Sequence, residues 1–289
     1  MKRTKRVLGL ALAAVMCMGL LAGCGGTPSN SDTADETSGT ETSEKVLNIA
    51  TIGETTTLSP LYMIADNRPT QKLLYEGLVK YVDGEIQPVL AEDWELSEDG
   101  TQLTFYLRQG VTFHDGEPFN AEAAIANIES WHINPSFASL PGVVNYTNIE
   151  AVDEYTIRLT YDTPYFAYIN DFCWPDVCTM ISPKLITQGD FQTVNGYAGT
   201  GPYVYDEYVA GQYTTFVRNE NYWGEQPYYD KIVAKYIPDN ASRVQALQTG
   251  EIDLIYGSAE LSYEDYNQAT AIEGIEGKFA PSGSTIRNI

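Results

Sequence analysis

Two histidines, four cysteines and many carboxylates are the residues that could do chemistry in this 289-residue chain. His114 and His132 form no H-E-x-x-H pattern and share no helical face, so their spacing does not suit a metal site. His114 suits a structural hydrogen bond in a turn, and His132 ends a predicted helix, where a cation complements the helix dipole. The sequence also lacks the glycine-rich patterns that expose a nucleophilic serine or cradle a phosphate. We therefore expect no catalytic site, no metal site, no cofactor and no enzymatic activity.

Two of the cysteines, Cys173 and Cys178, stand in the segment CWPDVC with four residues between them. Outside the cytoplasm a disulfide is the default for such a pair, although the loop that it would close is short. A redox motif would have two intervening residues, and a metal site would need more ligands nearby. The sequence leaves a disulfide and two free thiols equally open.

Aromatic residues suited to binding are abundant, with 21 Tyr and 4 Trp. Such side chains offer a ligand amphipathic contact area at low cost in conformational entropy, although most of them belong to a core or a sheet face. Loops at the ends of strands commonly carry ligand-binding residues. We therefore predict ligand contacts from the loop after the first strand, with packing and turn formation as the alternative roles. The candidates there are Thr56, Thr57, Leu58, Ser59 and Tyr62.

The clearest succession of elements lies in residues 199–257. Segments rich in Val, Tyr, Phe and Thr flank a glycine turn and predict a hairpin, and a further strand, a helix closed by Gly250 and a last strand follow it. The predicted bounds are Tyr203–Val209, Tyr213–Arg218, Asp230–Ile237, Ala241–Gly250 and Ile252–Tyr256.

The earlier residues predict more strands and helices in no regular order. These are the strands Val46–Ile52 and Leu78–Val82, the hairpins Trp94–Leu107 and Ile149–Thr160, and helices from Pro69 to Glu76, Ala121 to Trp131 and Phe166 to Phe172. Without repeats and without a regular βα alternation, the pattern indicates a mixed α+β or α/β fold.

Two long motifs carry a resemblance to a known family. One is Gly199-Thr200-Gly201-Pro202-Tyr203, followed by Arg218–Gly224 and then Gln248–Asp253. The other is the segment Trp94–Phe119. In this order they resemble solute-binding protein family 5, the extracellular binding proteins of ABC importers for dipeptides, oligopeptides or nickel chelates, from about Val46 to the last residue.

The resemblance implies a periplasmic-binding-protein-like fold of type II, a two-lobed "venus flytrap". Residues 45–289 would be the N-terminal lobe with an inserted subdomain at about 78–183, and the second lobe would be missing. By analogy Trp174 and Asp176 approach the rim of the cleft. Nickel-chelate binders in the family use arginines of the first lobe, whereas residues 131–149 and 171–179 contain neither Arg nor Lys. That departure favours peptides, and a nickel chelate remains the alternative.

The N-terminus predicts export. Four basic residues precede the apolar run Val7–Ala22, which is too short to span a bilayer. Leu21-Ala22-Gly23-Cys24 looks like a bacterial lipoprotein cleavage box, so residues 1–23 would be a signal peptide and Cys24 would carry the lipid. Residues 24–44 lack aromatic and large aliphatic side chains and predict a flexible tether. The protein would thus be extracytoplasmic and anchored to the cell membrane.

The charge balance narrows the partners. The chain carries 17 Lys and Arg against 39 Asp and Glu, a net charge of −22, which excludes nucleic acid as a partner. The resemblance implies a monomer that captures small peptides in an inter-lobe cleft and delivers them to an ABC permease and ATPase. A surface sensor or adhesion lipoprotein without transport is a further alternative.

Overall fold

A computed structural model describes residues 44–61, 68–174, 178–186, 196–256 and 261–278. The chain divides into two units, residues 1–42 and 43–289, and the described residues belong to the second. The predictions for the signal peptide, Cys24, most of the tether, Tyr62 and Asp176 fall outside the described residues.

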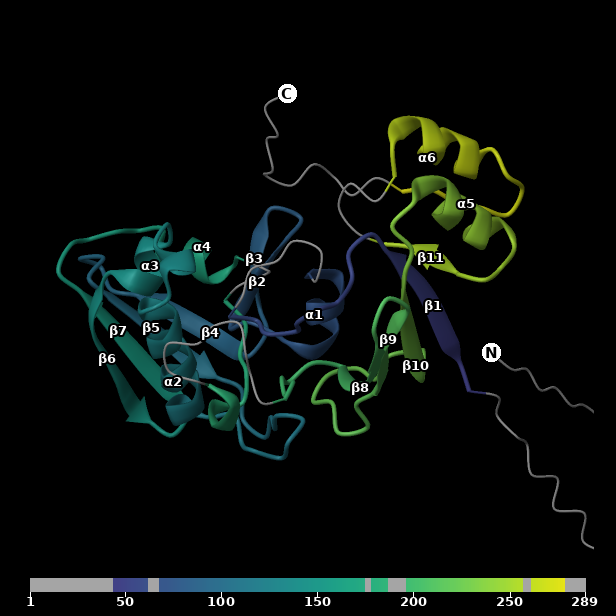
Figure 1. Cartoon of the computed structure of the whole chain (residues 1–289). Coiled ribbons are helices and arrows are strands. Elements are labelled where there is room, and N and C mark those ends of the chain that lie inside the picture. Colours follow the sequence, from purple (N-terminus) through teal and green to yellow (C-terminus); the bar gives the residue numbers. More distant parts are fainter. Residues whose placement is uncertain (1–43, 62–67, 175–177, 187–195, 257–260, 279–289) are drawn as a thin grey trace, which may run out of the picture. The chain divides into compact units, whose positions relative to one another are not determined.

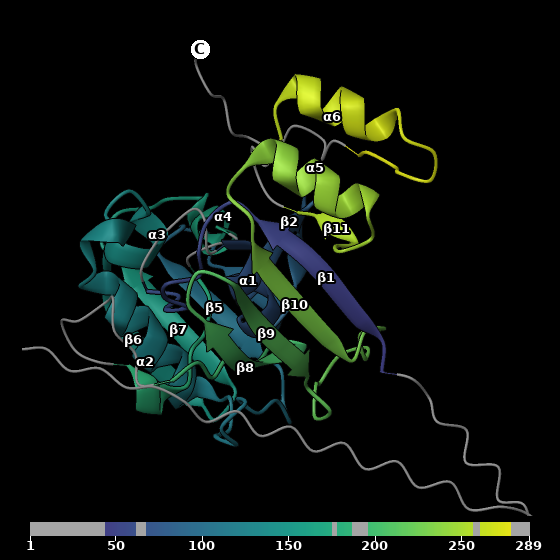
Figure 2. The same cartoon turned by 45° about the vertical axis from the view of Figure 1, so that its right-hand side comes forward.

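A five-stranded sheet joins the start of the chain to its last third, in the order β11-β1-β10-β9-β8 (Figures 1 and 2). The strand β1 is parallel to β10 and β11, with Ile49 opposite Ala234, whereas β8 and β9 add antiparallel strands at the other edge. Ile49, Phe216 and Ile232 are buried on this sheet together with Leu58 and Leu74. The strands are β1 Val46–Thr51, β8 Tyr203–Val209, β9 Tyr213–Arg218, β10 Lys231–Tyr236 and β11 Leu254–Ile255.

Helix α5 (Asn240–Gln248) connects β10 to β11, and α6 (Tyr263–Thr270) follows β11 and lies next to α5 (Figure 1). The side chain of Asp239 caps α5 by accepting a hydrogen bond from the Ser242 amide at 2.8 Å. Beyond its end, Gly250 has a φ of 71°, which glycine adopts without steric cost.

The residues between α1 and β8 in the sequence form a second sheet. It is wholly antiparallel, with the strand order β4-β5-β7-β6. Alternation decides its buried face, because Leu103, Phe105 and Leu107 of β5 are buried while Tyr106 points to solvent. The fully buried Ile128 and Trp131 of helix α2 (Ala121–His132) join the same hydrophobic core. The strands are β4 Ala91–Leu96, β5 Gln102–Leu107, β6 Tyr146–Asp153 and β7 Thr156–Tyr161.

Short elements complete the described residues. The hairpin of β2 (Val79–Val82) and β3 (Glu85–Pro88) turns at Asp83 and Gly84, whose φ angles are 50° and 92°. The helices are α1 Arg68–Leu74, α3 Pro141–Val144 and α4 Tyr168–Phe172, with 3₁₀ turns at Pro135–Phe137 and Pro183–Leu185.

The predicted elements form close to their predicted bounds, with one clear shortening. Of the predicted strand Ile252–Tyr256, only Leu254–Ile255 is a strand. The amide of Ile252 donates instead to the carbonyl of Ala246, at the end of α5. The first residue of the predicted strand therefore belongs to the C-terminal cap of α5.

Candidate ligand-binding region

The loop after β1 contains four of the predicted ligand-binding residues within the described part of the chain. Thr56 is exposed and Thr57 is half-buried, and the Thr57 hydroxyl accepts a hydrogen bond from the Ser59 amide at 3.1 Å. Leu58 and Ser59 are buried, Leu58 within the core of the five-stranded sheet. The loop therefore exposes Thr56 and part of Thr57 and buries the next two residues, Leu58 and Ser59.

The predicted rim of the cleft contributes Trp174, whose side chain is 46% exposed. The Trp174 carbonyl accepts a weak hydrogen bond from the Cys178 amide at 3.4 Å. Thr179 then pairs with Gly77 in an isolated bridge, and the Met180 amide donates to the Glu76 carbonyl at 2.8 Å. This exposed indole is thus carried on a segment that runs beside the residues following α1.

Two asparagines hold both segments against the same helix. The Asn127 side chain donates to the Ile181 carbonyl at 2.8 Å and accepts from the Ile181 amide at 2.9 Å. Seven residues on, just past the end of α2, Asn134 donates to the Leu61 carbonyl at 2.9 Å. Asn127 lies within α2 and Asn134 lies in the turn just after it, so this helix and its end anchor both the loop after β1 and the segment after Trp174.

A further amide fixes the loop from α1. The side chain of Gln71, a buried residue, donates to the Ser59 carbonyl at 2.8 Å. Our sequence reasoning missed Gln71, Asn127 and Asn134 because it looked for side chains that would touch a ligand. The available signal was an amide residue, Asn127, among the apolar positions of a predicted amphipathic helix.

The side chain of Glu76 connects two segments of the first sequence motif, residues 199–203 and residues 218–224. Its carboxylate accepts hydrogen bonds from the Thr200 hydroxyl at 2.9 Å, the Tyr222 hydroxyl at 2.7 Å and the Trp223 indole at 2.7 Å. Burial raises the pKa of Glu76 above its ordinary value, and these hydrogen bonds oppose the rise. The motif residues Thr200, Tyr222 and Trp223 therefore have a structural role around one buried carboxylate.

The glycines of the same motif allow a close approach of the backbone. A Cβ at Gly199 would lie 2.0 Å from the Leu74 carbonyl oxygen, and one at Gly201 would lie 2.6 Å from the Leu73 carbonyl oxygen. The Gly201 amide donates to that Leu74 oxygen at 2.9 Å. The glycines therefore allow the backbone before β8 to pack closely against the end of α1, a contact that any side chain would prevent.

His114 is a structural residue, as its turn predicted. Its Nδ1 accepts from the Gly199 amide at 3.3 Å, so Nε2 carries the proton and donates to the Gly201 carbonyl at 2.9 Å. Burial lowers the pKa of His114, in keeping with a neutral ring.

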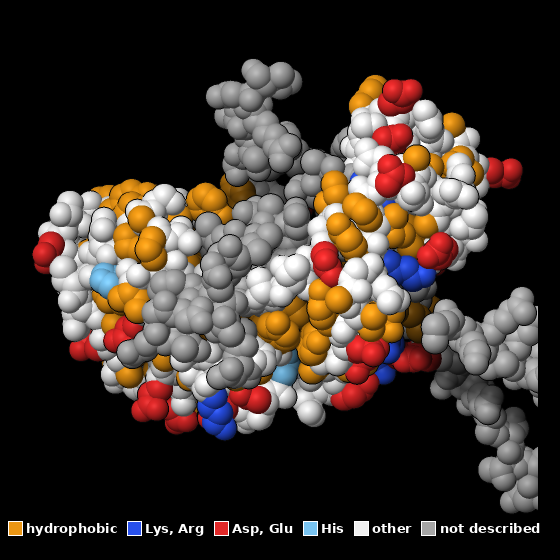
Figure 3. All heavy atoms as spheres, in the orientation of Figure 1, with side chains coloured by type: hydrophobic (Ala, Val, Ile, Leu, Met, Phe, Trp, Pro, Cys, Tyr) orange, Lys and Arg blue, Asp and Glu red, His pale blue; other side chains and the backbone are white. Residues whose placement is uncertain are grey.

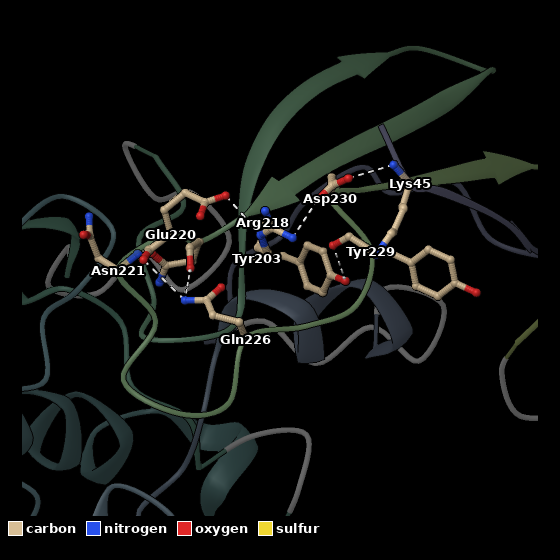
Figure 4. A network of polar contacts seen from close by, with 9 residues as sticks. Lys45, Tyr203, Arg218, Glu220, Asn221, Gln226, Tyr229 and Asp230 are labelled. Atoms are coloured by element: carbon tan, nitrogen blue, oxygen red, sulfur yellow. Dashed lines mark hydrogen bonds and ion pairs between the residues drawn. The ribbon is translucent and has the colours of Figure 1, made fainter. Parts of the chain in front are cut away.

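The charged residues of the motif form a network of ion pairs and hydrogen bonds beside the first residue of β1 (Figure 4). The guanidinium of Arg218 pairs with Asp230 at 2.6 Å and with Glu220 at 3.0 Å, and Asp230 accepts from the Lys45 amide at 2.7 Å. The Lys45 amide and the Arg218 charge lower the pKa of Asp230. Arg218 thus connects β9, through Asp230, to the residue before β1. Its Nε contacts Glu220 and its Nη1 contacts Asp230.

The two cysteines of CWPDVC are free thiols in the structure. Both are buried, and each donates to a carbonyl at 3.4 Å, Cys173 to that of Ile169 and Cys178 to that of Asp171. Burial and Asp171 raise the pKa of Cys173 to about 11. Such thiols are poor nucleophiles.

Two features are absent from the described residues. No group of three or more His, Cys, Asp or Glu side chains among them is placed to hold a metal ion. No helix in this part of the chain has the length and apolar composition of a membrane span.

Comparisons with known proteins identify the class. The family model of bacterial extracellular solute-binding proteins, family 5 Middle, matches residues 85–287. The nickel-binding periplasmic protein of Escherichia coli (strain K12) is 37% identical over 209 residues, which are 71% of this chain and 40% of that protein. The glutathione-binding protein GsiB of Pectobacterium atrosepticum is 34% identical over 219 residues, 72% of this chain and 41% of that protein.

A solved structure agrees with the sequence matches. NikA from Brucella suis, in complex with Fe(III)-EDTA, superposes with a TM-score of 0.72 at 33% identity and covers 78% of this chain and 46% of its own. The fold is that of the periplasmic binding proteins of type II, a class that binds solutes and does not catalyse reactions. Within that class, the chain belongs to the bacterial extracellular solute-binding proteins of family 5. It spans less than half the length of each of these three relatives.

Proposed function

We propose that this protein is the substrate-binding lipoprotein of an ABC importer and that it captures small peptides. Membership of family 5, shown by the match over residues 85–287, carries the proposal. The protein works as a monomer, and a permease with its ATPase receives the ligand and supplies the energy.

The described residues supply one wall of the binding cleft in this proposal. Thr56, Thr57 and the half-exposed Trp174 are its contact residues, together with Tyr62 and Asp176. A second lobe supplies the opposite wall, in keeping with the 40% to 46% of each relative that this chain covers. Closure of the lobes expels water and strengthens the polar contacts inside, and the closed form is what the permease recognises.

Charge favours a ligand with an ammonium group. Between Arg108 and Lys184 the sequence contains a single Lys or Arg, Arg158, and that guanidinium lies 3.7 Å from a Glu150 oxygen. A surface of this kind repels anions and attracts a cationic or zwitterionic ligand. A peptide in its zwitterionic form meets that requirement, and one relative is named for glutathione, itself a tripeptide.

A nickel chelate is the second candidate ligand. The relative at 37% identity is named for nickel, and the superposed structure holds Fe(III)-EDTA. Against it stands the absence of Lys and Arg from residues 131–149 and 171–179, where an anionic chelate would need a counter-charge.

Calorimetric titration of the complete extracytoplasmic protein distinguishes these ligands. We expect a mixture of dipeptides to bind in the micromolar range and nickel with histidine to give no heat of binding. If only the nickel and histidine mixture binds, the ligand is the nickel chelate and the peptide proposal is wrong. Residues 45–289 alone should bind neither ligand in that range, and micromolar binding by them would contradict the need for a second lobe.

Import is separated from sensing by an uptake assay. Cells that lack this protein should stop accumulating a labelled peptide and should regain uptake when the gene is restored. Unchanged uptake, with the peptide still bound in calorimetry, would favour a surface sensor or adhesion lipoprotein.

The membrane attachment belongs to the same proposal. Residues 1–23 are removed as a signal peptide, Cys24 receives the lipid, and residues 25–44 tether the folded residues 45–289 to the membrane. Labelled palmitate should mark the protein, and Cys24→Ala should abolish the label and release the protein from the membrane fraction. A labelled Cys24→Ala variant would contradict the assignment.

A further inference from the structure

A pocket of about 540 Å³ opens in the part of the chain that carries the four-stranded sheet, where α3, the start of β6 and the loop between β7 and α4 meet. Three tyrosines, two prolines and a valine supply its apolar lining, namely Tyr146, Tyr165, Tyr168, Pro141, Pro164 and Val144. It shares no lining residue with Thr56–Ser59 or Trp174, so it is separate from the proposed cleft contacts.

The rings at this pocket are held in place before any ligand binds. Tyr168 stacks on Tyr161 with centroids 3.7 Å apart, and Tyr165 meets the edge of Tyr168 at 4.8 Å. The hydroxyl of Tyr161 donates to the Gly142 carbonyl at 2.7 Å, and that of Tyr168 donates to the Thr163 carbonyl. Little side-chain entropy therefore remains to be lost when a ligand contacts these rings.

One lining ring is both fixed and accessible. Tyr165 is 37% exposed, although its amide is held by the Gly100 carbonyl at 3.2 Å. Figure 3 shows hydrophobic side chains gathered on the surface over α3, at the left of the view. This surface can offer an aromatic face to a ligand of modest size.

The charge around the pocket is negative. Residues 109–183 contain ten Asp and Glu against one Arg, and that Arg158 is paired with Glu150. Asp162 is a lining residue, and no described residue donates a hydrogen bond to its carboxylate. Glu129 and Asp171 are close enough to act electrostatically on Tyr146 and Tyr161. The nearest imidazole, His132, packs its ring against Tyr146 at 4.6 Å.

We propose that this pocket binds an organic ammonium ion, with the cation between the tyrosine faces and the Asp162 carboxylate and its alkyl groups against the prolines. Aromatic faces attract such a cation through their quadrupoles, and the carboxylate adds charge that no described lysine or arginine of the lining neutralises. An anion would meet repulsion from Asp162, and a neutral molecule would gain nothing from the charge of that exposed carboxylate.

Choline and its uncharged isostere 3,3-dimethylbutan-1-ol have the same shape and test the proposal directly. In an NMR titration of the whole chain with labelled tyrosine rings, choline should shift the ring signals along a saturable curve. The isostere should bind at least ~10-fold more weakly, since it lacks the charge. Equal binding of the two molecules, or no saturable shift below ~50 mM choline, would overturn the proposal.

Variants assign the binding to this pocket. Tyr165→Leu and Asp162→Asn should each weaken choline binding by about two- to fivefold, the range expected for one exposed cation contact. Phe166→Leu, at a neighbouring side chain that is 68% exposed and outside the lining, should leave it unchanged. If all three variants bind choline like the parent chain, the cation binds elsewhere and the assignment is wrong.

Discussion

Asn127 and Ile181 exchange two hydrogen bonds, so one buried side chain takes the place of a neighbouring strand for the backbone of another segment. Both residues are fully buried, and Asn127 also donates to the Ala123 carbonyl one turn earlier in α2. Main-chain groups of the segment that follows Trp174 are thereby bound to α2, in addition to the packing of Cys178 and Met180 in the core that contains Ile128.

Replacement of Asn127 by Leu should destabilise the fold by roughly 2–4 kcal/mol, because two buried backbone groups of Ile181 lose their partners. Urea unfolding measures the change. The matched control is Asn170→Leu at an exposed position of α4, which should change the free energy of unfolding by less than ~0.5 kcal/mol. Equal losses in the two variants would mean that the hydrogen bonds at Ile181 contribute nothing specific.

The carboxylate of Glu76 should make stability depend on pH. Because burial raises its pKa in the folded state, the folded protein holds the proton more tightly than the unfolded chain does. Stability contributed at this site is therefore highest at low pH and falls as the pH rises through the window between the unfolded and folded pKa values.

The variant Glu76→Gln isolates this effect. Its amide oxygen can accept from Trp223 and Thr200, and its amide group can donate to the Tyr222 hydroxyl oxygen. The free energy of unfolding of the parent chain, minus that of Glu76→Gln, should be smaller at pH 8 than at pH 5. A difference that stays constant or grows with pH would show that burial does not raise the pKa of this carboxyl.

The elements could be predicted from the sequence because their signals are local. The hairpin of β8 and β9 forms at its predicted bounds, since most of its residues are β-branched or aromatic and the turn contains Gly211. The buried positions of β5 and α2 likewise follow from periods of two and 3.6 residues.

Pairing between distant segments could not be predicted in this way. The parallel pairing of β1 with β10 joins residues about 185 positions apart, and nothing in either strand names its partner. The same holds for the candidate site, where Asn134 reaches Leu61 and Gln71 reaches Ser59. A local pattern predicted which loop would carry ligand contacts, and the amides that position that loop appear only when the chain is folded.

Gly199 should tolerate no side chain. In Gly199→Ala the new Cβ would lie 2.0 Å from the Leu74 carbonyl oxygen and 2.8 Å from its carbon, so backbone must move. We expect a loss of more than ~4 kcal/mol or failure to fold, seen as lost soluble expression or a collapsed urea midpoint.

The control for that prediction is Gly110→Ala, where nothing lies within 4 Å of the new Cβ and only the φ of 75° is strained. That variant should lose about 1 kcal/mol. A Gly199→Ala protein as stable as Gly110→Ala would refute the close contact between the end of α1 and the start of β8.

The thiols of Cys173 and Cys178 should resist alkylation until the protein unfolds. Both are buried free thiols, and burial raises the pKa of Cys173 to about 11 and that of Cys178 well above its ordinary value, so little thiolate forms at neutral pH. Iodoacetamide at pH 7.5 should therefore add no group to either residue in the native protein and one group to each in urea without reductant. Mass spectrometry counts the additions. If urea alone exposes no reactive thiol and a reductant is required, the two cysteines are joined in a disulfide, and the free pair is not their resting state.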